Sequence, residues 1–234
     1  QEWQALFNGK DLTGWDIKIT GYPLNYDPLN TFRVEEGLLK VRYEQYDTFG
    51  GRFGHLFHQQ TFSNYRLRAE YRFVGEQVAE APPWATKNSG LMIHGQSAKS
   101  MELMQDFPIS LEVQLLGGLG EEDRPTANLC TPGTDVMMNN QWLQQHCINS
   151  SAPTFHDDRW VTVEVLVLED SLIQHYVNGD TVLTYHHPKI HGGVVNGYNE
   201  SVKQDGKPLT EGSISLQSES HPIDFRKIEV MVLE

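Results

Sequence analysis

A carboxylate and an amide stand two residues apart in an apolar stretch of the chain, at Glu112 and Gln114. Side chains alternate in direction along a β-strand, so Leu111, Val113 and Leu115 would face a core while Glu112 and Gln114 face the opposite side. On one face of a sheet, this pair could bind sugar hydroxyls, and the glutamate could transfer a proton. The spacing predicts a carbohydrate site there, with a solvated outer face of the sheet as the alternative.

A histidine follows a similar pattern in the segment 88–94. Leu91 and Ile93 would face the core, and His94 would face away from it. An imidazole with an ordinary pKa of about 6.5 suits proton transfer near neutral pH. His94 is therefore a candidate acid or base, with a buried structural histidine as the alternative.

The chain has two cysteines, Cys130 and Cys147, in a segment rich in Asn, Pro, Gly and Gln. An even count and a short separation predict one local disulfide in an oxidising compartment, with two unpaired thiols as the alternative. No Cys-x-x-Cys pair is present, and His146 beside Cys147 does not complete a zinc ligand set. The sequence predicts no metal site and no cofactor, and leaves a divalent metal open.

The elements that must position these residues are predicted to be strands. Period-two alternation recurs in the segments 65–73 and 161–167, whereas helical periodicity is almost absent. Asn178-Gly179 predicts a hairpin, because both residues tolerate the positive φ angles of a type I′ turn. Many strands separated by turn signals predict an all-β sandwich or jelly roll.

Four long segments between the predicted strands are expected to be loops, and loops of this length usually carry function. They are the segments 20–31, 76–87, 117–151 and 186–210. Aromatic residues in or near these loops could stack on sugar rings or anchor the loops: Tyr22, Tyr26, Trp84, Trp142 and Tyr198.

The composition narrows the class of partner. The formal net charge is −13, from 18 Lys and Arg against 31 Asp and Glu. This charge repels phosphate backbones and anionic lipids, so we expect no nucleic-acid partner and no membrane insertion, while a neutral carbohydrate is compatible. No apolar run approaches the ~18 residues of a membrane-spanning helix. Without repeats or linkers, residues 1–234 are expected to form one domain, whose oligomeric state the sequence does not indicate.

Six motifs in order resemble the 3-keto-disaccharide hydrolase domain family across essentially the whole chain. The first is FNGKDLTGW at Phe7–Trp15. The others are Asn88-Ser89-Gly90, Leu111-Glu112-Val113-Gln114, His175-Tyr176-Val177-Asn178-Gly179, Gly212-Ser213-Ile214-Ser215-Leu216-Gln217 and Phe225-Arg226-Lys227-Ile228. The resemblance implies a concanavalin A-like jelly-roll β-sandwich of two antiparallel sheets, with a cleft on the concave sheet.

The same resemblance implies hydrolysis of glycosides whose sugar is oxidised at C3, in the periplasm or at the cell surface of a Gram-negative bacterium. A chain that starts at Gln1 rather than Met is expected to be trimmed, as after export. The sequence departs from the family where Ser218-Glu219-Ser220-His221 replaces the usual HG after the Leu-Gln pair. The insertion with both cysteines also looks like a subgroup feature, so we expect the substrate specificity to be affected.

A ketone at C3 acidifies the proton on C2, so a base could remove that proton and expel the C1 substituent by elimination, with water added afterwards. Glu112 or His94 is the expected base. The other expected site residues would orient hydroxyls or stabilise an enolate oxygen: Asn88, Gln114 and Gln217 in the first role, and His175 or Arg226 in the second.

Direct hydrolysis by two carboxylates is the alternative chemistry. It requires a second carboxylate near Glu112, for which Glu70 and Glu219 are the candidates. A non-catalytic carbohydrate-binding module is the competing class of function. Convergence of Glu112 with a second titratable group in one pocket would favour an enzyme. A structural partner of a surface glycan system, the third possibility, would present an exposed apolar patch.

Overall fold

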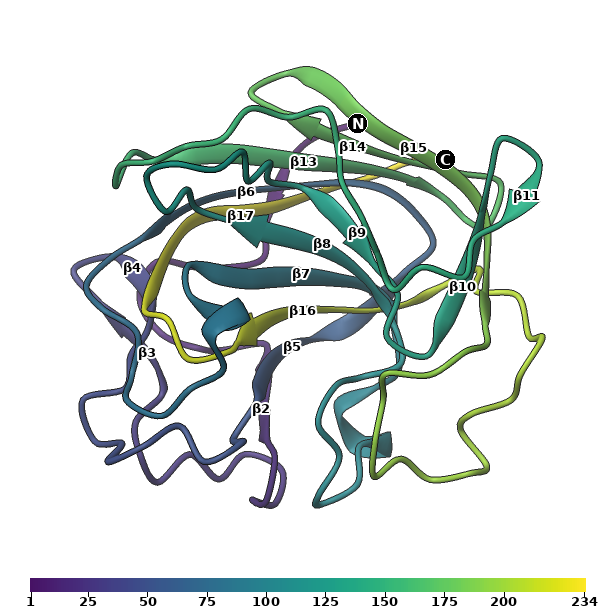
Figure 1. Ribbon diagram of the computed structural model, residues 1–234. Coiled ribbons are helices and arrows are strands. Elements are labelled where there is room, and N and C mark those ends of the chain that lie inside the picture. The colour runs from purple at the N-terminus through teal and green to yellow at the C-terminus, as the bar shows by residue number, and fades with distance from the viewer.

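The computed structural model describes residues 1–234 as two stacked antiparallel sheets (Figure 1). The larger sheet has ten strands in the order β11-β10-β15-β14-β13-β6-β17-β4-β3, with β1 also paired to β17. These strands are β1 (Gln4–Ala5), β3 (Phe32–Glu35), β4 (Leu38–Val41), β6 (Asn64–Phe73), β10 (Thr134–Met138), β11 (Gln141–Trp142), β13 (Val161–Leu168), β14 (Leu172–Val177), β15 (Asp180–Ile190) and β17 (Ile223–Val232).

The smaller sheet has seven strands in the order β12-β9-β8-β7-β16-β5-β2. They are β2 (Trp15–Ile19), β5 (Gly54–Phe62), β7 (Asn88–Gly95), β8 (Leu111–Leu116), β9 (Asn128–Cys130), β12 (Cys147–Ile148) and β16 (Gly212–Ser218). Two short 3₁₀ helices, η1 (Pro83–Ala85) and η2 (Ala98–Ser100), lie in the connections. None of the helices has the length and apolar composition that crossing a membrane requires.

The main core lies between the sheets and is built by strand alternation. Leu67 and Ala69 of β6 belong to the same cluster of 40 buried residues as Leu111 and Val113 of β8. Their strand neighbours point to the outer faces of the sheets, as the period of two requires. The predicted all-β jelly-roll sandwich is confirmed.

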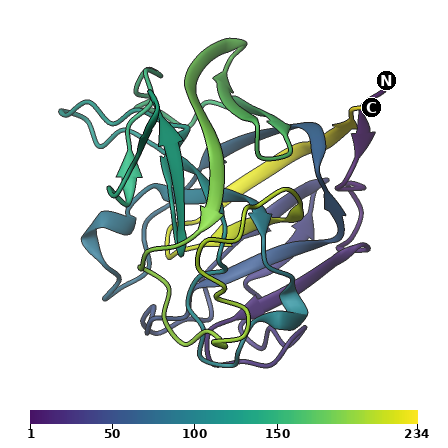
Figure 2. The ribbon, with the colours of Figure 1, turned by 90° about the vertical axis from the view of Figure 1, so that its right-hand side faces the viewer.

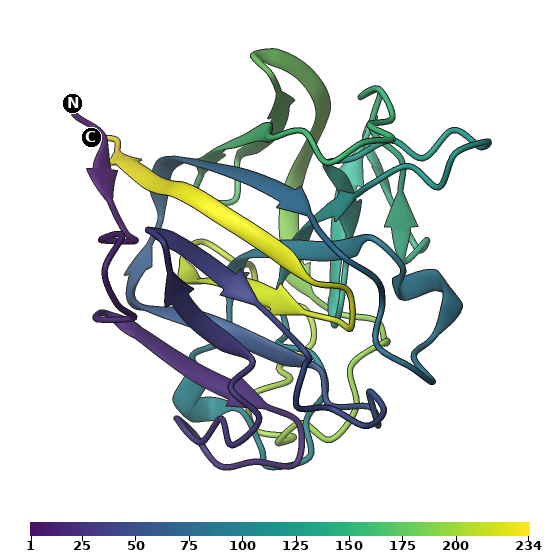
Figure 3. The ribbon, with the colours of Figure 1, turned by 90° about the vertical axis from the view of Figure 1, so that its left-hand side faces the viewer.

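The two chain ends meet at one edge of the sandwich, where β1 pairs with β17 (Figure 3). The predicted hairpin is also confirmed, because Asn178 and Gly179 take φ angles of 48° and 92° between β14 and β15. These features follow from local sequence, since turn residues and alternation decide them within a few residues.

Two of the expected loops contain more regular structure than predicted. The segment 117–151 carries β9, β10, β11 and β12, and β15 extends to Ile190 inside the segment 186–210. Four short strands of two to five residues are stabilised by their partners in the sheets, so their own sequence gives little alternation. The prediction of uninterrupted loops was wrong there.

The remaining long connection runs from β15 to β16 and lies beside the connection that carries η2 (Figure 2). Asp106 accepts hydrogen bonds from the backbone and side-chain nitrogens of Asn196 at 2.8 and 2.9 Å. Asn199 donates to Glu102 at 3.1 Å. These bonds join the two connections beside the outer face of the seven-stranded sheet.

Candidate functional site

Strand β8 places Glu112 and Gln114 on the outer face of the seven-stranded sheet. Leu111, Val113 and Leu115 belong to the main core, so the alternate side chains point away from it. The outer face is not solvated here, because loops cover it and leave Glu112 only 6% exposed. The alternative of an exposed surface carboxylate is therefore excluded for Glu112.

A glycine on the neighbouring strand gives the Glu112 side chain its room. Gly90 of β7 pairs with Gln114, and Met92 pairs with Glu112. A Cβ atom at Gly90 would lie 2.8 Å from Glu112 Cγ and 2.9 Å from its Oε2. No real Cβ approaches other atoms so closely, so the absent side chain at Gly90 lets the Glu112 carboxylate lie across β7.

A second carboxylate reaches the same pocket from the end of β16. Glu219 follows that strand directly and is 4% exposed. Burial raises the pKa of Glu112 to about 8. Burial, reinforced by the charge of Glu112, raises the pKa of Glu219 well above its ordinary value. Two buried carboxyl groups that disfavour each other's ionisation retain protons at neutral pH.

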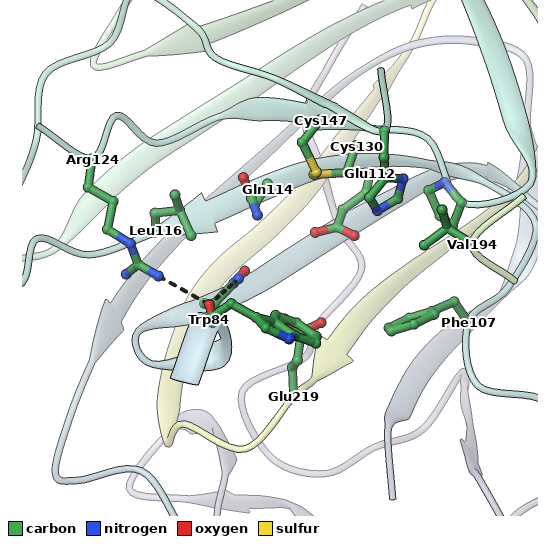
Figure 4. Close-up of a pocket in the computed structure, with 13 residues that line it drawn as sticks. Trp84, Phe107, Glu112, Gln114, Leu116, Arg124, Cys130, Cys147, Val194 and Glu219 are labelled. Carbon is green, nitrogen blue, oxygen red and sulfur yellow. Dashed lines mark hydrogen bonds between the residues drawn. A yellow bond between two sulfur atoms is a disulfide. The ribbon is translucent and has the colours of Figure 1, made fainter. Parts of the chain in front are cut away.

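The pocket between these carboxylates and the surrounding loops has a volume of about 440 Å³, within the usual range for a small-molecule site (Figure 4). Its side chains fall into two groups. Asn88, Gln114 and Arg124 offer hydrogen-bonding groups, whereas Phe107, Pro132 and Val194 are apolar. Figure 4 shows Arg124 at one end, Phe107 and Val194 at the other, and Glu112 pointing into the space between them.

The three polar side chains, Asn88, Gln114 and Arg124, are held by hydrogen bonds that leave some of their atoms free for a ligand. Asn88 donates to the backbone oxygen of Trp84 at 3.0 Å, while its own Oδ1 is buried without a partner. Gln114 Oε1 accepts from Asn128 at 3.0 Å, so its amide nitrogen remains available as a donor. Arg124 donates to the backbone oxygen of Gly117 at 2.7 Å. Burial without a carboxylate partner lowers the pKa of Arg124.

Trp84 provides an aromatic wall for the pocket. It lies in η1, is 54% exposed, and stacks on Phe53 with ring centroids 6.3 Å apart and planes at 9°. A tryptophan supported from behind and open in front is suited to stacking on a ring of the ligand. The other aromatic residues named from the sequence, Tyr22, Tyr26, Trp142 and Tyr198, do not line this pocket.

The predicted disulfide between Cys130 and Cys147 is confirmed and lines the pocket. Cys130 of β9 is the register partner of both Glu112 and Cys147, so the bond lies beside the carboxylate. His146 brings a ring nitrogen within 4.8 Å of the two sulfurs. Because the sulfurs are bonded to each other, neither is a thiolate that could hold a metal there with His146.

Four of the residues expected from the sequence come together in the pocket: Asn88, Glu112, Gln114 and Glu219. Gln217 of β16 does not line the pocket. It is fully buried, with its Nε2 3.5 Å from His55 Nε2. Glu219 rather than Glu70 is therefore the second carboxylate near Glu112.

His94 lies outside the pocket, and its position does not support the expected role as base. It takes a φ angle of 48° where the pairing of β7 with β16 shifts by one residue, so the alternation of side chains is interrupted at His94. Its Nε2 contacts the backbone oxygen of Glu169 at 2.7 Å, and burial lowers its pKa. His94 is thus a buried histidine held by a backbone hydrogen bond.

Three further expected residues belong to the other sheet. His175 of β14 is buried, with Nδ1 2.8 Å from the backbone oxygen of Ala127 and Nε2 2.8 Å from the Tyr185 hydroxyl. Glu70 of β6 and Arg226 of β17 form an ion pair on partly exposed side chains. Alternation reports the face of a strand but not which sheet the strand joins, so these expected site roles are not supported by position.

Sequence reasoning did not identify Arg124, His146, Phe107, Pro132 or Val194 as site residues. They lie in irregular segments or beside short strands, where no periodicity marks the direction of a side chain. The signal that pointed toward them was the length of the loops, which indicates a region and not a residue.

Among known protein families, the family model of the 3-keto-alpha-glucoside-1,2-lyase-like domain matches residues 2–231. Two Parabacteroides distasonis proteins with a provisional glycosyl hydrolase assignment share the fold. The first has a TM-score of 0.60 and 16% identity and covers 100% of both chains. The second has a TM-score of 0.58 and 18% identity and covers 99% of this chain and 94% of its own.

The carbohydrate-binding module CBM66 from Bacillus subtilis also shares the fold, with a TM-score of 0.52 and 10% identity. The alignment covers 92% of this chain and 94% of the module. No curated protein sequence matches the chain. At these identities the solved structures establish the fold.

Proposed function

Because the chain belongs to the 3-keto-alpha-glucoside-1,2-lyase-like domain family, we propose that it cleaves the glycosidic bond of 3-keto-glucosides in the Glu112–Glu219 pocket. The observation that carries the proposal is the convergence of two buried carboxyl groups with raised pKa values in one pocket. Such pairs are characteristic of acid–base sites, and burial of this kind is costly without a function.

The reaction is an elimination across C1 and C2 of the sugar. The C2–H bond breaks and its proton passes to the Glu112 carboxylate. The electron pair is first held as an enolate shared by C2 and the C3 oxygen. As this enolate collapses, the C1–C2 double bond forms while the C1–O bond breaks, and the departing oxygen takes the proton of Glu219. The pair suits this division of roles, because burial raises the pKa of both groups and the charge of Glu112, once ionised, raises the pKa of Glu219 further.

The C3 oxygen gains negative charge as the C2 proton leaves, and the polar end of the pocket can stabilise it. Arg124 brings a positive charge, and Gln114 brings a free amide donor. Fixed donors in a site that excludes water stabilise such charge strongly. The unpartnered Asn88 Oδ1 is available to accept a hydrogen bond from a sugar hydroxyl. Arg124 thus takes the role first expected of Arg226 or His175.

The test is incubation with a 3-keto-α-glucoside and with the same glucoside unoxidised. We expect release of the C1 substituent from the oxidised compound alone, with transient ultraviolet absorbance from the conjugated ketone. Direct hydrolysis by the two carboxylates would release the substituent without that absorbance. Release from neither compound would contradict the proposal and favour the competing function, a carbohydrate-binding module.

Glu112→Gln tests the residue that carries the reaction. We expect kcat to fall by about 10²- to 10⁴-fold, because the base is lost while the side-chain shape is kept. Glu70→Gln is the matched control, because Glu70 pairs with Arg226 outside the pocket, and its activity should be unchanged. Full activity in Glu112→Gln would show that another group is the base.

We further propose that the protein works after export, in the periplasm or at the cell surface of a Gram-negative bacterium. The disulfide supports this setting, since such bonds persist in oxidising compartments. Its position in the pocket wall ties the integrity of the site to that environment. A measurement of the thiol content of the protein from the periplasmic fraction would contradict the proposal if both cysteines were reduced.

A further inference from the structure

The pocket continues beyond the two carboxylates into an end lined by Phe107, Pro132 and Val194 (Figure 4). None of these three carries a hydrogen-bonding side chain. The opposite end holds Arg124, which does carry such groups, beside Leu116. The guanidinium of Arg124 and the three apolar side chains thus lie on opposite sides of Glu112.

Val194 is held in an unfavourable backbone conformation at this apolar end. Its φ angle is 65°, and a β-branched residue rarely adopts that left-handed region. Its side chain is also 49% exposed rather than packed in a core. Strained residues of this kind concentrate at functional sites, where the surrounding structure fixes them. An exposed, strained valine in a pocket wall is best explained by contact with a ligand.

The neighbouring residues account for how Val194 is fixed. Val195 is buried with Ile109 in a small cluster, which anchors the chain just after Val194. Gly133 donates a backbone hydrogen bond to Gly193 at 2.8 Å, which anchors the chain just before it. These two anchors leave the Val194 side chain no core to enter, so it faces the pocket.

Phe107 is fixed from a different loop. Its ring packs on Phe53 with centroids 4.8 Å apart, and its backbone nitrogen donates to Asp106 at 2.7 Å. The same Asp106 carboxylate binds the backbone nitrogen of Asn196 at 2.8 Å, which joins this loop to the one that carries Val194. The apolar end is therefore a preformed wall from two linked loops.

We propose that Phe107, Pro132 and Val194 form a subsite for an apolar leaving group, so that the preferred substrates are glycosides of apolar alcohols and not disaccharides. This inference rests on the proposed function. A departing sugar would bring its hydroxyl groups against surfaces that cannot replace their hydrogen bonds to water. A hydrocarbon ring of similar size would instead leave water and contact the three side chains.

The test compares two oxidised substrates in the whole protein, isomaltose oxidised at C3 of its non-reducing glucose and the cyclohexylmethyl 3-keto-α-glucoside. Both leaving groups depart through a primary alcohol oxygen, so the comparison does not rest on a more acidic leaving group. We expect the kcat/KM of the wild type to be at least ~10-fold higher for the cyclohexylmethyl compound. Equal values, or a preference for the disaccharide, would overturn the inference and leave the proposed function standing.

Val194→Asn assigns the preference to the subsite. Asparagine tolerates a positive φ angle, so the backbone should be kept while the apolar contact is lost. We expect kcat/KM to fall by about 10-fold for the cyclohexylmethyl compound and to stay within about twofold for the disaccharide. Leu119→Asn is the control, because Leu119 is similarly exposed at 56% but does not line the pocket. Equal losses on both substrates would contradict the assignment.

Calorimetric binding of the unoxidised glycosides separates the two proposals, because it requires no turnover. If the protein cleaved neither oxidised compound, the proposed function would fail. The subsite would still be supported by tighter binding of cyclohexylmethyl α-glucoside than of isomaltose, with that difference lost in Val194→Asn. Equal binding of the two glycosides by the wild type would overturn it.

Discussion

At the scale of single residues, the site depends on two glutamates that the protein keeps away from water. Glu112 and Glu219 lie on different strands or strand ends, and burial is the first cause of the raised pKa of each. The charge of Glu112 is a further cause for Glu219 alone. The pair therefore loses its protons in two steps, which suits it to provide one base and one acid.

The pH dependence of activity follows from these two steps. Glu112 must lose its proton to act as the base, so kcat/KM is expected to rise with pH, and the midpoint of this rise is expected at about pH 8. Glu219 must keep its proton, so activity falls again at higher pH. In Glu219→Gln we expect a lower kcat, an unchanged rising limb and no falling limb. A profile that already decreases between pH 6 and pH 8 would contradict these roles.

Gly90 offers a second test at this scale. Gly90→Ala would place a methyl group 2.8 Å from Glu112 Cγ, and the flexible glutamate side chain would give way. We expect kcat to fall by about 10²-fold, because displacement of a catalytic group by about 1 Å is costly. Circular dichroism and thermal melting should show a retained fold. Unchanged activity would mean that Glu112 does not need to lie across β7.

At the scale of elements, the pocket wall depends on two very short strands. β12 has two residues and pairs with β9, which in turn pairs with β8 beside Glu112. Strands this short bury little surface of their own, so the covalent link adds to the few hydrogen bonds that hold β12, such as that from Thr131 N to His146 O at 2.9 Å. The disulfide thus connects the stability of the wall with the geometry of the site.

Removal of the disulfide is expected to weaken both. The bond closes a loop of 17 residues, and in the chain-entropy model such a link stabilises the protein by about 3 kcal/mol. We expect the double variant Cys130→Ser/Cys147→Ser to lose about this free energy of unfolding. Urea denaturation of the variant and of the oxidised wild type measures the difference. Identical midpoints would show that β12 is held without the bond.

At the scale of the whole molecule, the two packed sheets share one core drawn from both of them, and we propose that residues 1–234 fold as one domain. Several titratable side chains are buried inside this fold. Burial lowers the pKa of His55 to about 3 and that of His175 to about 4, while it raises that of Glu112 to about 8. Each shift links folding to pH.

The signs of these shifts predict a stability maximum in mildly acidic solution. As pH falls below about 6.5, the unfolded histidines bind protons that buried His55 and His175 do not, so stability is lost. As pH rises from about 4.5 toward 8, unfolded glutamates release protons that buried Glu112 keeps, so stability is lost again. We expect the melting temperature to be higher near pH 6 than at pH 4 or pH 9.

Glu112→Gln separates the two limbs of this dependence. Because glutamine does not titrate, the variant should lose less stability than the wild type as pH rises from about 4.5 to about 8. As pH falls from 6 to 4 it should lose more than the wild type, which regains the Glu112 contribution there. Thermal melting followed by circular dichroism provides the comparison. An equally steep alkaline limb in the variant would mean that Glu112 is not buried as a protonated acid in solution.

The sequence by itself determined the local features of this protein. Alternation placed Glu112 and Gln114 opposite the core residues of β8, the Asn178-Gly179 turn closed a hairpin, and the ordered motifs indicated the family and the sandwich. All of these are properties of short segments, because the period of a strand and the φ angles of a turn are set within a few residues.

Only the tertiary structure decided which of these local features meet. Regular alternation along β7 would place His94 on the same face as Gly90, but a bulge interrupts it, so His94 contacts the backbone of Glu169 and only Gly90 lies beside Glu112. From the sequence, Glu70 and Glu219 are equal candidates for the second carboxylate. Strand pairing places Glu70 in the ten-stranded sheet, whereas Glu219 lines the pocket beside Glu112. Val194 enters the pocket from a loop without any periodicity. Long-range strand pairing and loop packing bring such residues together, and neither leaves a mark in the spacing of nearby residues.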